Sequence, residues 1–119
     1  MTKSLNKMKK RIFCFDIDGV ICKTFKSDYK NSVPIKKNIK KINDFYNQGH
    51  TIKIFTARFM GRNKDNSILA KKKGFKFTSL QLKKWNLKYH KLIMGKPSYD
   101  YFLDDKSFNN FKELMKKIK

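Results

Sequence analysis

The chain has 119 residues, of which thirty are Lys or Arg and nine are Asp or Glu, giving a formal net charge of +21. This length supports a single domain over residues 1–119 and leaves no room for a second folded unit of ordinary size. Two cysteines without metal-ligand spacing exclude a disulfide framework, and no apolar run is long enough for a signal peptide or a membrane span, so we expect a cytoplasmic protein without membrane contact.

The positive charge raises the alternative of a nucleic-acid partner, because Lys and Arg neutralise phosphates. Only three of the thirty basic residues are Arg, the better reader of phosphates and base edges, whereas Asn is frequent and Ala is rare. An AT-rich coding sequence produces this bias without selection for a partner. We therefore expect attraction of anionic substrates in general, and we do not favour nucleic acid.

We expect residues 1–10 to form a flexible basic N-terminus, followed by a first strand. The run Ile12 to Phe15 is apolar and is bounded by charge, which is typical of a strand buried on both faces of a parallel sheet. Pro34 can open the first helix and Gly49 can stop it. The residues at helical spacing between them are Ile35, Ile39, Ile42 and Tyr46.

A β-branched run from Thr51 to Phe55 predicts the second strand, and a helix from about Asn63 to Lys73 follows, with Gly74 to end it. The next expected element is a short helix through Trp85, for which Thr78 and Gln81 form a capping box. The third strand is expected from His90 to Met94.

A fourth strand is expected at Tyr101 to Leu103, and Ser107 can cap a last helix. That helix would place Phe108, Phe111, Met115 and Ile118 on one face. Strands and helices in alternation predict an α/β fold with a mostly parallel central sheet and helices on both faces. Ligands of such folds bind beyond the carboxyl ends of the strands. The residues that follow the four expected strands are Asp16 and Asp18, Thr56, Lys96, and Asp104 and Asp105.

Four of the nine acidic residues lie in two short groups, Asp16 with Asp18 and Asp104 with Asp105, each after a strand-like run. Carboxylates this close repel one another and raise each other's pKa unless a positive charge lies between them. A divalent cation with oxygen ligands, Mg²⁺, is the simplest such charge. The sequence therefore predicts a metal site at which the two groups meet.

In its order of motifs, Asp16-Ile17-Asp18-Gly19-Val20, then Thr56, Lys96 and Asp104-Asp105, the chain resembles the haloacid dehalogenase (HAD) superfamily of phosphotransferases. Taken singly, Asp18-Gly19 is an ordinary turn signal, Thr56 a helix cap and Lys96 a solvated loop residue. Together they occur in order at the ends of strands over nearly the whole chain. The resemblance implies a three-layer Rossmann-like core.

By resemblance, Asp16 is the nucleophile that forms an aspartyl-phosphate, and Asp18 is the general acid and base. Thr56 would hold a phosphoryl oxygen, and Lys96 would neutralise that group and Asp16. Mg²⁺ would bind Asp16, the backbone carbonyl of Asp18 and one of the acidic pair, with Asp105 the first choice and Asp104 the second. The loop residues Gly19, Ala57 and Arg58 are further candidates for contact with substrate.

Between the motifs there is no room for a folded cap domain, so the site should be open, and a small substrate would favour a homo-oligomer. The wording around Thr56 and from Trp85 to Asp105 is similar to small capless phosphatases of capsular and surface polysaccharide biosynthesis. This similarity implies a sugar phosphate as substrate. Two alternatives remain open: a polynucleotide 3′-phosphatase that uses the basic surface, and a non-catalytic binding protein.

Overall fold

The computed structural model describes residues 9–118 of the chain. The expected flexible N-terminus at residues 1–10 lies outside the described residues up to residue 8. Lys9 and Lys10 are exposed, and the Lys10 ammonium donates to the Gln48 carbonyl oxygen at 2.7 Å. Within residues 9–118, no helix has the length and apolar character needed to cross a lipid bilayer.

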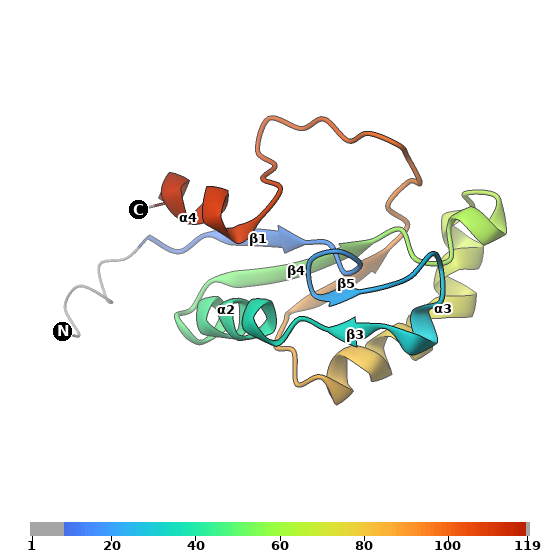
Figure 1. Cartoon of the computed structure of the whole chain (residues 1–119), viewed down its shortest axis with the longest axis horizontal. Coiled ribbons are helices and arrows are strands. Elements are labelled where there is room, and N and C mark those ends of the chain that lie inside the picture. Colours follow the sequence, from blue (N-terminus) through green and yellow to red (C-terminus); the bar gives the residue numbers. More distant parts are fainter. Residues whose placement is uncertain (1–8, 119) are drawn as a thin grey trace.

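Three strands form a parallel sheet in the order β1, β4, β5 (Figure 1): β1 is Ile12–Phe15, β4 is Thr51–Thr56 and β5 is Lys91–Met94. These are the first three predicted strands, so the mixed α/β fold with a parallel sheet is confirmed. Helix α2, Lys36–Asn47, connects β1 to β4, and helix α3, Ser67–Lys84, connects β4 to β5.

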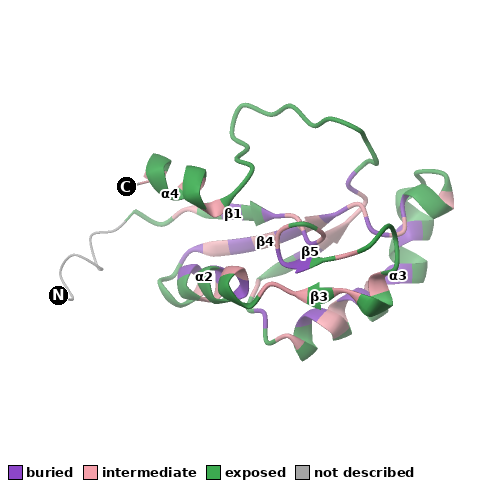
Figure 2. Ribbon diagram, in the orientation of Figure 1, coloured by how far each residue is buried: buried purple, intermediate pink, exposed green. Residues whose placement is uncertain are grey.

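The core lies between one face of the sheet and the helices α2 and α3. In β1, Phe13 and Phe15 are buried whereas Ile12 and Cys14 are exposed, and β4 alternates in the same way (Figure 2). Buried side chains from both layers meet in one cluster that includes Phe13, Phe15, Ile39, Ile42, Phe45, Ile52, Ile54, Leu82 and Leu92. Burial of this apolar surface is the main stabilising contribution to the fold.

The second face of the sheet is the first point at which the prediction was wrong. Ile12 is 68% exposed, so β1 is not buried on both faces. The last helix, α4, is Phe111–Ile118 and lies at the β1 side of the sheet, where the Phe111 ring stacks on Phe15 at 5.6 Å between centroids (Figure 1). Because Phe15 points into the core, α4 does not cover the opposite face, and the expected three-layer arrangement is not seen in residues 9–118.

The expected fourth strand is also missing from residues 9–118. Every residue from 97 to 110 is exposed, and the segment forms a long loop in which Tyr101 and Leu103 are 95% and 100% exposed (Figure 2). The aromatic rings of Tyr99 and Phe102 pack on each other at 5.1 Å and on the Lys96 ammonium. These local contacts replace pairing with the free edge of β1.

Helix α3 is one continuous helix where the sequence predicted two. Gly74 lies inside it, and a Cβ atom at Gly74 would be only 2.2 Å from Cδ2 of Phe59. The glycine therefore permits close approach of the loop after β4 and does not end the helix. Thr78 is buried in mid-helix and forms no capping box. The side chain of Asn66 caps α3 by accepting from Ile68 and Leu69.

The last helix begins later than predicted. The Ser107 hydroxyl donates to the Asp104 carbonyl oxygen, and the Asn110 side chain accepts from the Glu113 backbone N–H at 2.9 Å. Asn110 is thus the residue that satisfies the helix start. Between β1 and α2 the chain forms only a short antiparallel pair, β2 (Cys22–Lys23) with β3 (Val33–Pro34), and a 3-10 turn, η1 (Tyr29–Asn31). A second 3-10 turn, η2, is Gly61–Asn63.

Candidate active site

Three of the four predicted motifs meet at the carboxyl edge of the sheet. The register pairs Phe15 with Ile54 and Thr56 with Met94, so the residues that follow β1 and β5 lie beside the end of β4. The Lys96 backbone N–H donates to the Thr56 carbonyl oxygen at 3.1 Å. Parallel strands bring these distant positions together because their ends point in one direction.

Asp16 is a half-buried carboxylate with one cation beside it. Its Oδ1 accepts the Ile17 backbone N–H at 2.7 Å, and its Oδ2 lies 3.3 Å from Nζ of Lys96. Burial raises the pKa of Asp16 above its ordinary value, and the positive charge of Lys96 opposes this shift without cancelling it. The negative charge of Asp16 is therefore only partly compensated by the protein.

Lys96 is 8% exposed, and its ammonium lies 4.8 Å from the ring centroid of Phe102 and 5.2 Å from that of Tyr99. Burial alone would lower the pKa of Lys96, but its interactions with Tyr99 and Asp16 outweigh burial, and the net shift is upward. Lys96 therefore stays positively charged at neutral pH, next to the Asp16 carboxylate.

The loop after β1 is folded tightly around one carbonyl group. The Ile17 carbonyl oxygen accepts the backbone N–H groups of Val20, Ile21 and Cys22. Gly19 has a φ of +93°, and no atom lies within 4 Å of the place where a Cβ would be, so the backbone angle alone favours glycine there. The Gly19 N–H donates to the Cys22 carbonyl oxygen at 2.8 Å, so in this loop it is used internally.

Asp18 is held by a buried guanidinium. Its Oδ1 lies 3.0 Å from Nη2 of Arg58, its Oδ2 lies 3.0 Å from Nε of Arg58, and the Thr24 hydroxyl also donates to Oδ1. The side chain of Arg58 is fully buried, whereas that of Asp18 is 29% exposed. Sequence analysis proposed Arg58 as a contact for substrate, but in the structure its donors point to groups of the protein.

Thr56 is completely buried, and its hydroxyl oxygen accepts the Arg58 backbone N–H at 3.0 Å. The hydroxyl proton is left to donate to a further acceptor at this edge. Ala57, between them, is half-buried. Thr56 thus lies at the predicted place, and its contact with Arg58 fixes the direction in which the chain leaves β4.

The acidic pair is not brought to this edge. Asp104 and Asp105 lie on the exposed loop, where the Lys106 backbone N–H donates to the Asp104 carboxylate and holds the pKa of Asp104 below its ordinary value. Across residues 9–118, no three His, Cys, Asp or Glu side chains are grouped so that they could hold a metal ion. The donors at the edge, the Asp16 carboxylate and the Asp18 carbonyl, fit part of a Mg²⁺ ligand set and not all of it.

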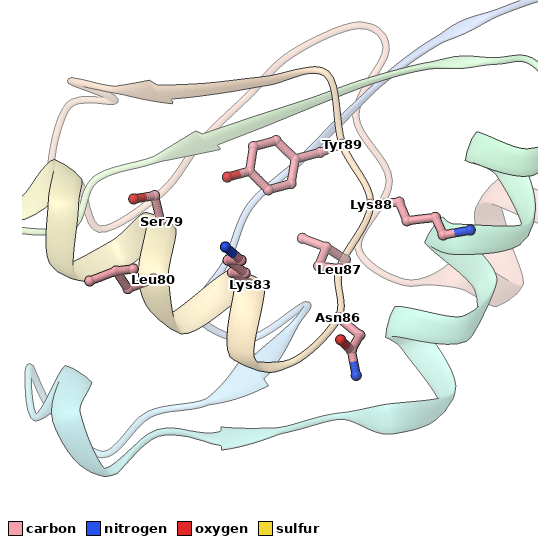
Figure 3. A pocket seen from close by; sticks show the side chains of 7 residues that line it. All are labelled: Ser79, Leu80, Lys83, Asn86, Leu87, Lys88 and Tyr89. Atoms are coloured by element: carbon pink, nitrogen blue, oxygen red, sulfur yellow. The ribbon is translucent and has the colours of Figure 1, made fainter.

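Two hollows flank the sheet. One, of about 490 Å³, lies where α3 ends and is lined in part by Lys83, Leu87 and Tyr89 (Figure 3). Because Tyr89 precedes β5 whereas Lys96 follows it, this hollow lies at the opposite edge from Asp16. The other, of about 430 Å³, adjoins Gly19 and Val20, and its lining includes Lys37, Lys41 and Lys112. The second hollow is therefore the one beside the candidate site.

Sequence analysis missed the residues that surround Arg58, above all Gln81. The Gln81 side-chain oxygen accepts from Nη1 of Arg58 at 2.6 Å, and its amide donates to the Tyr29 carbonyl oxygen at 2.8 Å. A signal existed: Gly74, Thr78 and Gln81 follow one another at spacings of four and three residues, which places them on one face of a continuous helix. The assumed break at Gly74 concealed this face.

The two histidines were predicted to be structural, and the structure bears this out. His50 is buried, and its Nδ1 accepts the Arg11 backbone N–H at 3.0 Å, while Nδ1 of His90 accepts the Ile52 N–H at 3.0 Å. Trp85 and Tyr89 are packed against the core. None of the four takes part in the candidate site.

Neither a protein-family model nor a curated protein matches the chain. Among solved structures, the chain is similar to a protein from Vibrio cholerae whose crystal structure was determined as an MCSG target. The two are 26% identical, the match covers 84% of this chain and 83% of the other, and the TM-score is 0.75. The likeness supports the α/β fold.

Proposed function

We propose that the protein is a Mg²⁺-dependent phosphatase that hydrolyses a phosphate monoester through an aspartyl-phosphate on Asp16. The observation that carries this proposal is the half-buried Asp16 carboxylate, 3.3 Å from the Lys96 ammonium at the carboxyl edge of the sheet. An ordinary surface ion pair needs neither the burial of both groups nor the second carboxylate, Asp18, two residues further on. The resemblance to the HAD superfamily supports the same assignment.

In the first step, an oxygen of Asp16 attacks phosphorus and the bond to the ester oxygen breaks. The carboxyl group of Asp18 gives its proton to that leaving oxygen, which departs as an alcohol. Lys96 and the Thr56 hydroxyl stabilise the negative charge on the phosphoryl oxygens. The products of this step are the alcohol and phosphorylated Asp16.

In the second step, the Asp18 carboxylate takes a proton from a water molecule, whose oxygen attacks phosphorus. The bond between phosphorus and Asp16 breaks, which releases inorganic phosphate and restores the free carboxylate. Asp18 thus acts first as acid and then as base, and it ends the cycle as it began.

A bound Mg²⁺ would offset the repulsion between the Asp16 carboxylate and the anionic ester. The partly compensated charge of Asp16 is what such a cation would satisfy, and we propose the Asp18 backbone carbonyl as a second ligand. Asp105, or else Asp104, is the third ligand that we propose, on the loop that follows Lys96.

For the substrate we propose a sugar phosphate of the kind used in polysaccharide biosynthesis, in a cytoplasmic and oligomeric enzyme. The site has no cap, because the chain between Asp16 and α2 forms only the β2–β3 pair and one 3-10 turn. The hollow beside Gly19 offers three lysines to the remainder of an anionic substrate.

A polynucleotide 3′-phosphatase is the second candidate, and the observation in its favour is a row of exposed lysines on α2. Lys36, Lys37, Lys40 and Lys41 all face solvent. Against it stands the scarcity of arginine, the side chain best suited to phosphate recognition. A non-catalytic binding protein is the third candidate, and it predicts no turnover at all.

The decisive experiment is hydrolysis of 4-nitrophenyl phosphate by the wild-type protein and by Asp16→Asn, with Mg²⁺ and with a chelator. We expect Mg²⁺-dependent turnover that Asp16→Asn lowers by at least about 10³-fold, since a catalytic nucleophile has no substitute. Asp44→Asn is the matched control, because it makes the same change on an exposed carboxylate of α2. Turnover retained in Asp16→Asn would refute the mechanism, and an inactive wild-type protein would favour the binding role.

A second experiment identifies the class of substrate. Release of phosphate is compared between hexose and heptose phosphates and 3′-phosphorylated oligonucleotides, at increasing salt concentration. We expect the sugar phosphates to be preferred with little dependence on salt. Preference for oligonucleotides with a steep loss at high salt would establish the second candidate instead.

A further inference from the structure

Arg58 stands out in the described structure as a fully buried charged side chain whose donors all point at protein groups. It occupies the centre of a cluster drawn from three parts of the chain: the loop after β1, the β2–β3 segment and helix α3. A buried guanidinium needs a carboxylate and satisfied donors, because an uncompensated buried charge is strongly unfavourable. The carboxylate it has is Asp18.

The contacts fix Arg58 on every side. Nε and Nη2 meet Asp18, Nη1 donates to the Gln81 side-chain oxygen at 2.6 Å, and Cζ lies 4.7 Å from the centroid of the Tyr29 ring. Gln81 is itself oriented, because its amide donates to the Tyr29 carbonyl oxygen at 2.8 Å. The guanidinium plane therefore has one orientation, and it imposes that orientation on Asp18.

The two oxygens of Asp18 are treated differently by this cluster. Oδ1 receives Nη2 and Nε of Arg58, the Thr24 hydroxyl and, at 3.5 Å, the Cys22 thiol. The contact recorded at Oδ2 within residues 9–118 is Nε of Arg58 at 3.0 Å. Since a carboxylate oxygen has two acceptor directions, Oδ2 keeps one of them for a proton.

We propose that Arg58, supported by Gln81, is a positioning residue that anchors Oδ1 of Asp18 and thereby presents Oδ2 to the leaving oxygen and to the attacking water. This inference rests on the proposed function, in which Asp18 transfers the proton. It replaces the role in substrate contact that the sequence suggested for Arg58. It also assigns Gln81, on a helix that carries none of the four motifs, to the same reaction.

Such a role predicts a signature that loss of stability does not produce. An ester with a poor leaving group needs the proton from Asp18, whereas a good leaving group departs almost without it. Loss of the correct orientation should therefore lower kcat/KM far more for poor leaving groups. Damage to the fold would lower kcat/KM by the same factor for all esters.

The test compares kcat/KM for 4-nitrophenyl, phenyl and 4-methoxyphenyl phosphate, which differ mainly in the leaving group, for the wild-type protein, Arg58→Ala, Arg58→Lys and Gln81→Met. For Arg58→Ala we expect a loss of about 10²-fold or more with the two poorer leaving groups and about 10-fold or less with 4-nitrophenyl phosphate. Arg58→Lys keeps the charge without the paired donors, so it should show the same pattern. Gln81→Met should show it with a smaller loss.

Ile42→Ala is the control, because it removes buried contacts in α2 and touches none of these residues. It should lower thermal stability while the dependence on leaving group stays that of the wild-type protein. Added guanidinium, below denaturing concentrations, should restore part of the activity of Arg58→Ala and none of that of Asp16→Asn.

Equal losses for all three esters in the Arg58 and Gln81 variants would overturn the positioning role and leave the phosphatase assignment intact. An inactive wild-type protein, or an active Asp16→Asn, would overturn the proposed function instead. If Arg58→Ala does not fold, Arg58→Lys and Gln81→Met decide the question by the same comparison.

Discussion

Around Asp18 the chain is held by contacts between segments far apart in the sequence, whereas between residues 97 and 110 every residue is exposed. Both regions carry carboxylates that the motifs assign to one site. Asp18 has a buried guanidinium as its partner, but Asp104 has only the backbone N–H of Lys106 two residues along. The comparison shows that a carboxylate is fixed in place by a cation that comes from elsewhere in the fold.

Asp16 lies between these extremes. Its partner Lys96 is nearly buried, yet Lys96 also begins the exposed loop. The pair is therefore held on one side by the sheet and on the other by the aromatic rings of Tyr99 and Phe102. Substitutions in each region should differ in size and in kind, and they fall in the following order.

Lys96→Met should have the largest effect. It leaves the buried Asp16 carboxylate without a cation and removes a positive charge from the transferring phosphoryl group. We expect kcat for 4-nitrophenyl phosphate to fall by about 10²- to 10³-fold. Lys91→Met makes the same change at the exposed start of β5 and should change kcat little. Equal losses in both variants would show that the effect is one of overall charge.

Asp105→Asn should act on the metal requirement. If Asp105 is a ligand, the Mg²⁺ concentration for half-maximal activity should rise by about 10-fold or more, with a smaller rise for Asp104→Asn. Asp100→Asn, also on the exposed loop, is the control. A Mg²⁺ titration that is the same for all three variants and the wild-type protein would remove the acidic pair from the site.

Gly74→Ala should lower stability. The added methyl group would lie 2.2 Å from the Phe59 ring, and overpacking of this kind costs about 1–3 kcal/mol, of which the better helix propensity of Ala recovers about 1 kcal/mol. We therefore expect the free energy of unfolding in urea to fall by about 1–2 kcal/mol. Gly61→Ala is the control, since the nearest atom to its Cβ would be at an ordinary 3.8 Å. A Gly74→Ala protein as stable as wild type would show that Phe59 moves aside freely.

The smallest expected effect is the pH dependence contributed by Asp16. Because the folded state raises the pKa of Asp16, it binds this proton more tightly than the unfolded chain does. Stability from this group is therefore present below the ordinary aspartate pKa and is lost as the pH rises through the raised value. In metal-free buffer, Asp16→Asn should match the wild-type protein at low pH and exceed its Tm at neutral pH.

Added Mg²⁺ should reverse this order if Asp16 is a ligand. A cation that binds only the folded state raises Tm, and the rise should be seen in the wild-type protein and not in Asp16→Asn. A wild-type protein that is more stable than Asp16→Asn at neutral pH without metal would contradict the raised pKa. Thermal melts over a range of pH, with a chelator and then with Mg²⁺, measure both effects.

The sequence alone determined the three strands, the helix that becomes α2 and the meeting of Asp16, Thr56 and Lys96. These predictions rest on short-range patterns: apolar runs of strand length, helical spacing from Ile39 to Ile42, and the rule that parallel strands end at one edge. Each depends on residues close in sequence, and for that reason a single sequence was enough.

Only the tertiary structure decided how Gly74, Arg58 and Gln81 are used. Gly74 looked like a helix end because its effect on the backbone is local, whereas its contact with Phe59 is not. Arg58 and Gln81 are 23 residues apart, and Asp18 is 40 residues before Arg58, so no local pattern joins them. The same holds for the exposed face of the sheet and the loop from 97 to 110, because packing between distant segments determines which apolar surfaces are covered.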